Sequence, residues 1–363
     1  MENGITKKQS AMLQGIAILM MVYHHLFAFA ETYASLLPFF NADAARQIAW
    51  FCKICVGIFA FVSGYGMYYA LGSSRQERFF RGLAAEYRCV LVRILRLYGK
   101  LWLVLLVFKG IDVLVWGQPF AAGELPGNLT ALNPTYNGAW WYVEQYAKML
   151  LVLPFLDLLF TRFPEAAEKK KKWLFLLILA GLGAGAALAG LLWWRPLWEL
   201  LLAAAKSMRI SFLLVFVVGY LTARYALYQR ADGWLRRRGG WLPTAVSAAL
   251  IAGVIALRVR LATDAAYAEL DFLLAPLLIY GLLTLLAYLE PLGSFLAWWG
   301  RQSTYMWLTH VFFYEWLHTV VKQYMRLDIW VYIAVLLASA AASLALRGAA
   351  GLFCRTGKRR SAL

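Results

Sequence analysis

The chain has 363 residues, a formal net charge of +17, 62% apolar residues and only 15% charged residues. Apolar runs of about twenty residues recur along it, which is typical of a polytopic membrane protein and excludes an ordinary soluble domain. The basic residues lie in short loops between the apolar runs and form no separate basic domain, so no nucleic-acid partner is expected.

The apolar run from Ala11 to Ala30 carries two adjacent histidines, His24 and His25. It is too long for a signal peptide and lacks a small-residue cleavage site, so we expect it to stay in the protein as a span. Ionisable side chains are costly in hydrocarbon, and a span that keeps them usually faces a protein interior where they do chemistry. The histidine pair therefore predicts a functional site inside the membrane.

The expected fold is an all-α integral membrane protein, a single domain of residues 1–363 built from about ten transmembrane helices. The predicted spans are 11–31, 48–71, 89–108, 139–160, 173–193, 209–228, 241–261, 272–289, 303–320 and 329–350. With both termini in the cytoplasm, the inner loops receive most of the 36 Lys and Arg residues, as the positive-inside rule requires. The predicted location is a multi-pass position among the lipids of a cell membrane, with the bacterial cytoplasmic membrane expected.

Five short motifs follow one another on particular predicted spans. They are Gly15–Leu19 leading to His24–His25, Phe59–Tyr65, Arg93–Tyr98, Trp141–Val143 and Ser303–His310. In order and spacing they resemble the landmarks of the membrane-bound acyltransferase-3 family, from about Gly15 to His310. The resemblance implies an enzyme that takes an acyl group, with acetyl expected, from cytoplasmic acyl-CoA. The group would pass to a hydroxyl of a cell-surface or lipid-linked glycan.

One position departs from the family pattern. Members commonly carry an arginine on the first span, eleven residues before the histidine, and this chain has Gln14 there. Gln14 and His25 still share one helix face, about 16 Å apart. Because an amide cannot neutralise phosphate, either another basic residue has taken over at the donor end or donor use differs.

His25 is the predicted catalytic base. An unperturbed imidazole has a pKa of about 6.5, so near pH 7 it can remove the proton of a hydroxyl that attacks a thioester. Glu144 and Glu315 could hold an imidazole in one tautomer, although a carboxylate paired to a base near the interface is an equal alternative for each. Direct attack and a covalent acyl-imidazole relay both stay open.

His310 is the second predicted catalytic histidine. It shares a face of the ninth predicted span with Ser303 and Tyr314, and a polar stripe on an apolar helix should turn inward. It could orient His25, bind the acceptor, or be a hydrogen-bonded core histidine.

The donor side is predicted from the resemblance and from charge. Ser63 and Tyr65 would line the route of the acyl-pantetheine arm, although helix packing at Gly64 explains this motif equally well. Arg93 and Arg96 are the basic pair closest to the bundle, and arginine suits phosphate because its planar fork bonds two oxygens. We expect these two arginines to contact the CoA phosphates.

The remaining predicted site residues are assigned to the acceptor or to support of the site. They are His24, Lys53, Trp141, Tyr142, Tyr305 and Glu315. His24 lies about 100° around the helix from His25, so the two cannot both point straight at one ligand. A hydrogen bond from His24 to a neighbouring helix is the simpler alternative.

A zinc site is a weaker possibility. Cys52 and Cys55 share a helix face at a depth similar to that of His24 and His25, which would give two thiolates and two imidazoles. Cysteines are commonly small buried hydrophobes, and Lys53 between them would repel a cation. No metal is expected.

Two other classes of membrane protein use inward polar residues without chemistry. A transporter or flippase would bind and release its substrate there, and helix breaks at 181–190 or at Arg195–Pro196 would suit it. A ligand-sensing membrane domain is the third class. The ordered motifs favour the enzyme, and CoA release from a thioester would distinguish it from both.

Overall fold

The structure, a computed structural model, describes residues 4–28, 42–77, 79–162, 208–261, 269–324 and 327–360. In these ranges it is helical, without strands. The α-helices are α1 (Lys7–Phe27), α2 (Ala42–Cys52), α3 (Cys55–Ala70), α4 (Phe79–Val104), α5 (Gly110–Leu114), α6 (Leu125–Thr130), α7 (Trp141–Asp157), α11 (Ile210–Arg224), α12 (Leu227–Arg238), α13 (Leu242–Leu261), α14 (Asp271–Leu286), α15 (Glu290–Tyr324) and α16 (Ile329–Arg360). Single turns of tighter or wider helix, among them η4 (Gly138–Trp140), extend several of these.

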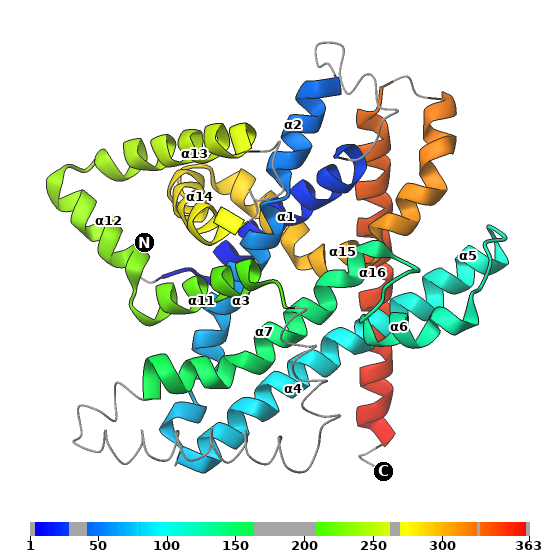
Figure 1. Ribbon diagram of the computed structural model, residues 1–363, viewed down its shortest axis with the longest axis horizontal. Helices are drawn as coiled ribbons and strands as arrows, with labels where there is room; N and C mark the ends of the chain where they lie inside the picture. Colours follow the sequence, from blue (N-terminus) through cyan, green and yellow to red (C-terminus); the bar gives the residue numbers. More distant parts are fainter. Residues whose placement is uncertain are drawn as a thin grey trace.

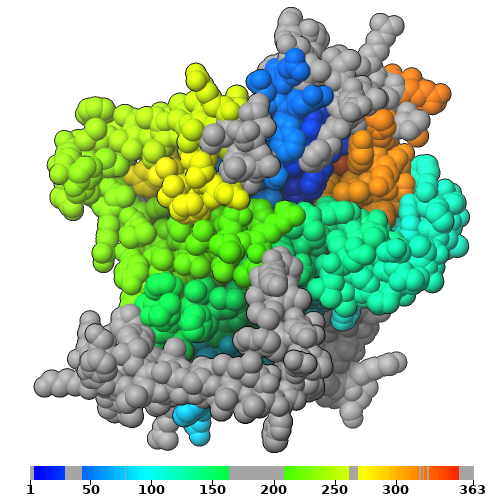
Figure 2. All heavy atoms as spheres, in the orientation of Figure 1, coloured from blue at the N-terminus to red at the C-terminus, as the bar shows by residue number. Residues whose placement is uncertain are grey.

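Helix α1 lies near the middle of the molecule, with the long α16 along one side and α12 and α13 forming an arm on the other (Figure 1). The space-filling view shows α5 and α6 at one edge of this face and α12 at the opposite edge (Figure 2). The catalytic motifs predicted from the sequence lie on helices between these two edges.

Four helical segments of the described chain are long and apolar enough to cross a membrane: Lys7–Phe27, Asp43–Ala70, Leu242–Arg260 and Ile329–Ala350. The pair Ile210–Arg224 and Leu227–Arg238, bent by 61°, makes a fifth if it is one broken span. The chain is therefore a helical membrane protein. The count of ten spans stays a prediction, and the predicted span at 173–193 lies outside the described residues.

Two predicted spans gain detail from the helices observed. The span predicted at 48–71 lies within the apolar segment Asp43–Ala70. Inside that segment the turn at Lys53–Ile54 separates α2 from α3, where two i→i−3 bonds, Lys53 N–H to the Trp50 carbonyl (3.3 Å) and Ile54 N–H to the Phe51 carbonyl (3.2 Å), tighten the chain. The span predicted at 303–320 is the middle of α15, a single helix of 35 residues. Apolar length alone shows neither a tightened turn nor a helix that continues through polar residues.

Helices α1 and α15 make the most extensive helix contact in the described structure. A Cβ atom added to Gly15 would lie 1.9 Å from the Leu296 carbonyl oxygen, and one added to Gly300 would lie 1.8 Å from the Ala11 carbonyl oxygen. The two backbones therefore touch where both helices lack side chains, a close approach that small residues allow in membranes. This crossing fixes the relative position of the histidines that the two helices carry.

Helices α3 and α11 approach each other in the same way. A Cβ on Gly64 would lie 2.0 Å from the Phe216 carbonyl oxygen, and a Cβ on Gly219 would lie 2.2 Å from the Phe61 carbonyl oxygen. Gly64 thus permits the close backbone approach expected from the sequence.

A buried ionic network ties the turn after α3, η1 (Ser74–Gln76), to α4, α7 and α11. Asp157 is fully buried and accepts hydrogen bonds from Arg75 Nε (2.7 Å) and the Tyr220 hydroxyl (2.6 Å). Arg162, one turn past α7, pairs with the buried Glu86 of α4. Buried charges need such partners, and the pair of Arg162 and Glu86 holds the first turns of α4 against the segment that follows α7.

Candidate active site

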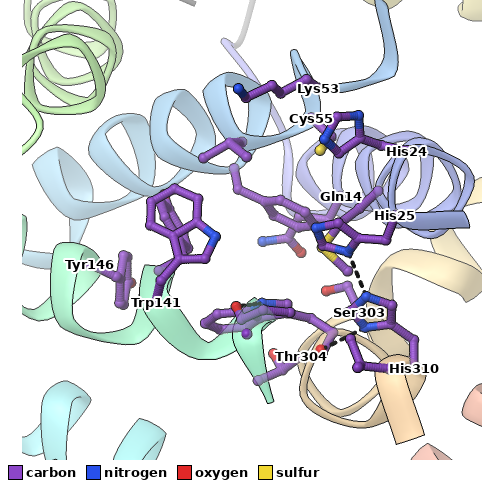
Figure 3. A pocket seen from close by; sticks show the side chains of 18 of the residues that line it. Gln14, His24, His25, Lys53, Cys55, Trp141, Tyr146, Ser303, Thr304 and His310 are labelled. Carbon is purple, nitrogen blue, oxygen red and sulfur yellow. Dashed lines mark hydrogen bonds between the residues drawn. The ribbon is translucent and has the colours of Figure 1, made fainter. Parts of the chain in front are cut away.

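A cavity of about 580 Å³ lies between α1, α3, α7 and α15. Its polar lining residues include Gln14, His24, His25, Lys53, Ser63, Tyr146, Arg209, Ser303, Thr304, His310, Tyr314 and Glu315. Figure 3 shows the two halves of the lining, with α1 and the start of α3 facing α7 and α15. A pocket of this size, mostly apolar with convergent polar groups, is the usual form of a small-molecule site.

The central feature of the cavity is a pair of histidines from α1 and α15. His25 Nδ1 lies 2.6 Å from His310 Nε2, and the two rings stack with centroids 4.8 Å apart (Figure 3). The close crossing of the two helices at Gly15 and Gly300 brings these residues, 285 positions apart, into contact.

The hydrogen bonds of the pair fix its protons when both rings are neutral. His310 Nδ1 lies 2.8 Å from the Trp307 carbonyl oxygen, which can only accept, so Nδ1 carries the hydrogen and Nε2 is an acceptor. His25 must then donate from Nδ1 to His310 Nε2. That leaves His25 Nε2 with a free lone pair, which is the form of imidazole needed for a general base or nucleophile.

His24 lines the cavity beside this pair but is held differently. Its Nδ1 lies 2.7 Å from the Ala49 carbonyl oxygen, so it donates a hydrogen bond to α2. The Trp50 ring meets it edge-on, with centroids 5.6 Å apart. The hydrogen bond to a neighbouring helix matches the simpler interpretation of this residue.

The two cysteines considered for a zinc site, Cys52 and Cys55, are buried free thiols. Among the residues that the structure describes, no group of three or more His, Cys, Asp and Glu side chains is arranged to hold a metal ion.

Aromatic side chains of α7 and α15 form the wall opposite α1. Trp307 meets Tyr142 edge-on at 5.8 Å and donates from Nε1 to the Ala139 carbonyl oxygen (3.0 Å). Trp140, fully buried, donates from Nε1 to the Leu308 carbonyl oxygen (2.9 Å). These bonds dock the start of α7 onto α15 beside His310, so the motifs around Trp141 and His310 form one rigid wall.

Most of the predicted site residues meet at this cavity. Those that line it are Gln14, His24, His25, Lys53, Ser63, Trp141, Tyr142, His310 and Glu315. Tyr65, Arg93, Arg96, Glu144 and Tyr305 are not part of its lining. Arg93 and Arg96 are exposed on α4, four positions and one position before Leu97, which does line the cavity.

Three predicted site residues that do not line the cavity make other contacts in the structure. The Glu144 carboxylate pairs with Lys148, one turn further along α7, which matches the alternative of a carboxylate paired to a base. The group that accepts from His310 Nδ1 is the Trp307 carbonyl. The Tyr65 hydroxyl accepts a hydrogen bond from the Ile5 N–H (2.9 Å) and is buried away from the cavity. Tyr305 is buried, with the Lys100 ammonium 5.5 Å from its ring centroid.

Several lining residues were not assigned to the site from the sequence, among them Arg209 and Trp307. Arg209 places its guanidinium 4.4 Å from the Trp141 ring centroid, and the signal for it was a basic residue at the very start of an apolar run. Trp307 lies three residues before His310, where its carbonyl can reach the histidine ring of the same helix.

The chain matches the model of the acyltransferase-3 family, described as an acyltransferase domain, over residues 11–348. It belongs to this family. The match covers nearly the whole chain, including both histidines of the stacked pair. Neither a curated protein nor a solved structure matches it. The protein is thus a membrane acyltransferase.

Proposed function

We propose that this acyltransferase moves an acyl group, and specifically acetyl, from acyl-CoA to a hydroxyl of a cell-surface or lipid-linked glycan. The observation that supports this best is the His25–His310 pair, because its hydrogen bonds leave the His25 Nε2 lone pair available in a membrane-embedded cavity. The whole chain forms one catalytic domain in this proposal, set in the bacterial cytoplasmic membrane.

The reaction begins with proton removal by His25. Nε2 takes the proton of the acceptor hydroxyl as its oxygen attacks the thioester carbonyl. The imidazolium that forms donates from Nδ1 to His310 Nε2, which stabilises its charge. When the tetrahedral intermediate collapses, the C–S bond breaks and His25 returns the proton to the CoA sulfur.

His25 Nε2 could also attack the thioester itself and carry the acyl group to the acceptor in a second step. Both routes need the same free lone pair. Trapping of an acyl-His25 species in the absence of acceptor would select the relay.

The donor enters from the α4 side in this proposal. Leu97 lines the cavity and lies one position from Arg96 and four from Arg93, which puts all three on neighbouring parts of the α4 surface. Tyr146, which also lines the cavity, lies within the electrostatic reach of Arg93. The arginines can hold CoA phosphates outside the cavity while the pantetheine arm, lined by Ser63, leads the thioester toward His25.

The purified protein should release CoA from acetyl-CoA when glycan acceptors are added, which neither a transporter nor a sensor would do. Replacing Arg93 and Arg96 together with glutamine should raise the apparent KM for acetyl-CoA by about 10-fold or more, because charge-assisted bonds to phosphate are lost. The control is Arg238→Gln on α12, which removes an exposed arginine outside the cavity. An unchanged donor KM in the double variant would move the phosphate site elsewhere.

The same proposal places both termini and the Gly72–Arg96 segment in the cytoplasm, with ten spans in the full chain. In a cysteine-free background, a single cysteine at residue 85 should be protected from an impermeant thiol reagent in intact cells, and one at residue 130 should be labelled. The reverse pattern would invert the topology and put the donor on the other side.

A further inference from the structure

One part of the cavity wall, on the side of His24, is cationic. Lys53 and Arg209 are the only Lys or Arg side chains among the described residues that line the cavity. Lys53 stands at the break between α2 and α3, and Arg209 immediately precedes α11.

Aromatic rings support both cations. The Arg209 guanidinium lies 4.4 Å from the Trp141 centroid, and the Lys53 ammonium lies 5.6 Å from the Trp50 centroid. A guanidinium held against an indole by cation–π attraction keeps its N–H edge available to two oxygens of an anion. These residues can therefore bind an oxyanion.

The charged residues near Lys53 include one ion pair and one further cation. Lys53 lies within the electrostatic reach of Arg209, Arg258 and Asp271. Arg258 and Asp271 are both buried and joined by an ion pair of 3.1 Å, so their charges offset each other. Lys53 and Arg209 are like charges within electrostatic reach of each other on the cavity wall, and an anion bound between them would reduce their mutual repulsion.

A carboxylate also lines the cavity. Glu315 of α15 has Asp112 and Lys109 as its charged neighbours, and these two form their own ion pair of 2.7 Å. Glu315 therefore belongs to a separate group of charges around α5.

The cationic wall is next to the proposed reaction centre and away from the Gln14 end of the cavity. His24 lies within the electrostatic reach of Lys53 and touches Trp50, whereas Gln14 is about 16 Å away along α1 from His25. The donor arm, entering past Leu97, has its phosphates on α4. An anion at Lys53 and Arg209 would thus belong to the second substrate.

We propose, building on the proposed function, that the acceptor is an anionic glycan. Its phosphate or carboxylate binds Lys53 and Arg209 and so holds a nearby hydroxyl against His25 Nε2. The other source of the same chemistry is the CoA phosphates, and the experiment must distinguish the two.

The kinetic test compares acceptors that differ only in charge. With acetyl-CoA as donor, the wild-type protein should use glucose 1-phosphate or glucuronate with kcat/KM at least about 10-fold above that for glucose, one charge-assisted contact being worth about that factor. Lys53→Gln and Arg209→Gln should each remove this preference by raising the acceptor KM, and Arg209→Lys should retain part of it. The matched control is Arg238→Gln, since Arg238 also covers an indole, with its guanidinium 3.5 Å from the Trp234 centroid, but lies outside the cavity.

Two outcomes would overturn the proposal: equal use of glucose and its charged counterparts by the wild type, or a raised KM for acetyl-CoA instead of the acceptor in the Lys53 and Arg209 variants. The second outcome would assign the wall to the CoA phosphates.

Calorimetric titration of the same sugars, without donor, separates this proposal from the proposed function. Tighter binding of glucose 1-phosphate and glucuronate than of glucose by the wild type, lost in the Lys53→Gln, Arg209→Gln double variant, would support the anion site even if no acyl transfer were found. Equal binding of charged and neutral sugars would refute it even if transfer were efficient. Circular dichroism and thermal unfolding of each variant show whether a lost signal comes from misfolding.

Discussion

Replacing His25 with alanine should slow acyl transfer by about 10²–10⁴-fold, the usual effect of removing a general base. The reason is geometric. His310 uses Nδ1 to bond the Trp307 carbonyl and Nε2 to accept from His25, so His25 Nε2 is the free basic nitrogen of the pair. Binding of acetyl-CoA should change little, because its phosphates are proposed to lie on α4.

The matched control is His24→Ala. His24 adjoins His25 on α1 and lines the same cavity, but its ring is bonded to the Ala49 carbonyl of α2. Its loss should cost much less turnover than the loss of His25. If His24→Ala were inactive and His25→Ala turned over normally, the base would be His24. If both variants kept normal turnover, the chemistry would lie elsewhere.

His310 should behave as a positioning residue. His310→Ala removes the acceptor of the His25 Nδ1 hydrogen and leaves the ring free to rotate, so turnover should fall while the KM for acetyl-CoA stays constant. His310→Gln offers a carbonyl oxygen to the same hydrogen and should restore part of the rate. A purely structural role would give no such rescue.

Much of this arrangement is visible in the sequence. Histidines in an apolar span predict an inward-facing site, and the polar stripe on the ninth predicted span predicts that His310 also faces inward. Both follow from the cost of polar groups in lipid and from helical periodicity. The order of the motifs indicates the family, to which the chain does belong.

The contacts between helices could not be predicted in this way. Helical periodicity gives the helix face on which Glu144 lies. It does not show which side chain pairs with the carboxylate, and in the structure that side chain is Lys148, one turn further along α7. The break at Lys53–Ile54 depends on two i→i−3 hydrogen bonds within an apolar run, where composition carries no signal. From the sequence alone, Arg209 looks like a charged loop residue. Only the packing of α11 and α7 places its guanidinium over the Trp141 ring.

The crossing of α1 and α15 should be the most sensitive packing point of the described fold. Gly15→Ala and Gly300→Ala each put a methyl group within 2 Å of a backbone carbonyl oxygen on the other helix, 1.9 Å and 1.8 Å away respectively. Backbone cannot move aside as a side chain can, so the helices must separate. Overpacking of this kind costs about 1–3 kcal/mol or more, which exceeds the gain of about 0.5–1 kcal/mol that alanine normally brings over glycine in a helix.

The control is Gly66→Ala on α3, an exposed helical glycine with nothing within 4 Å of an added Cβ. Thermal unfolding in detergent should show a lowered Tm for the Gly15 and Gly300 variants and an unchanged or raised Tm for the Gly66 variant. Because α1 carries His25 and α15 carries His310, any folded fraction should also transfer acyl groups more slowly, as a displacement of about 1 Å can cost about 10²-fold in rate. A Gly300→Ala protein as stable and as active as Gly66→Ala would show that the close crossing does not hold the histidine pair in place.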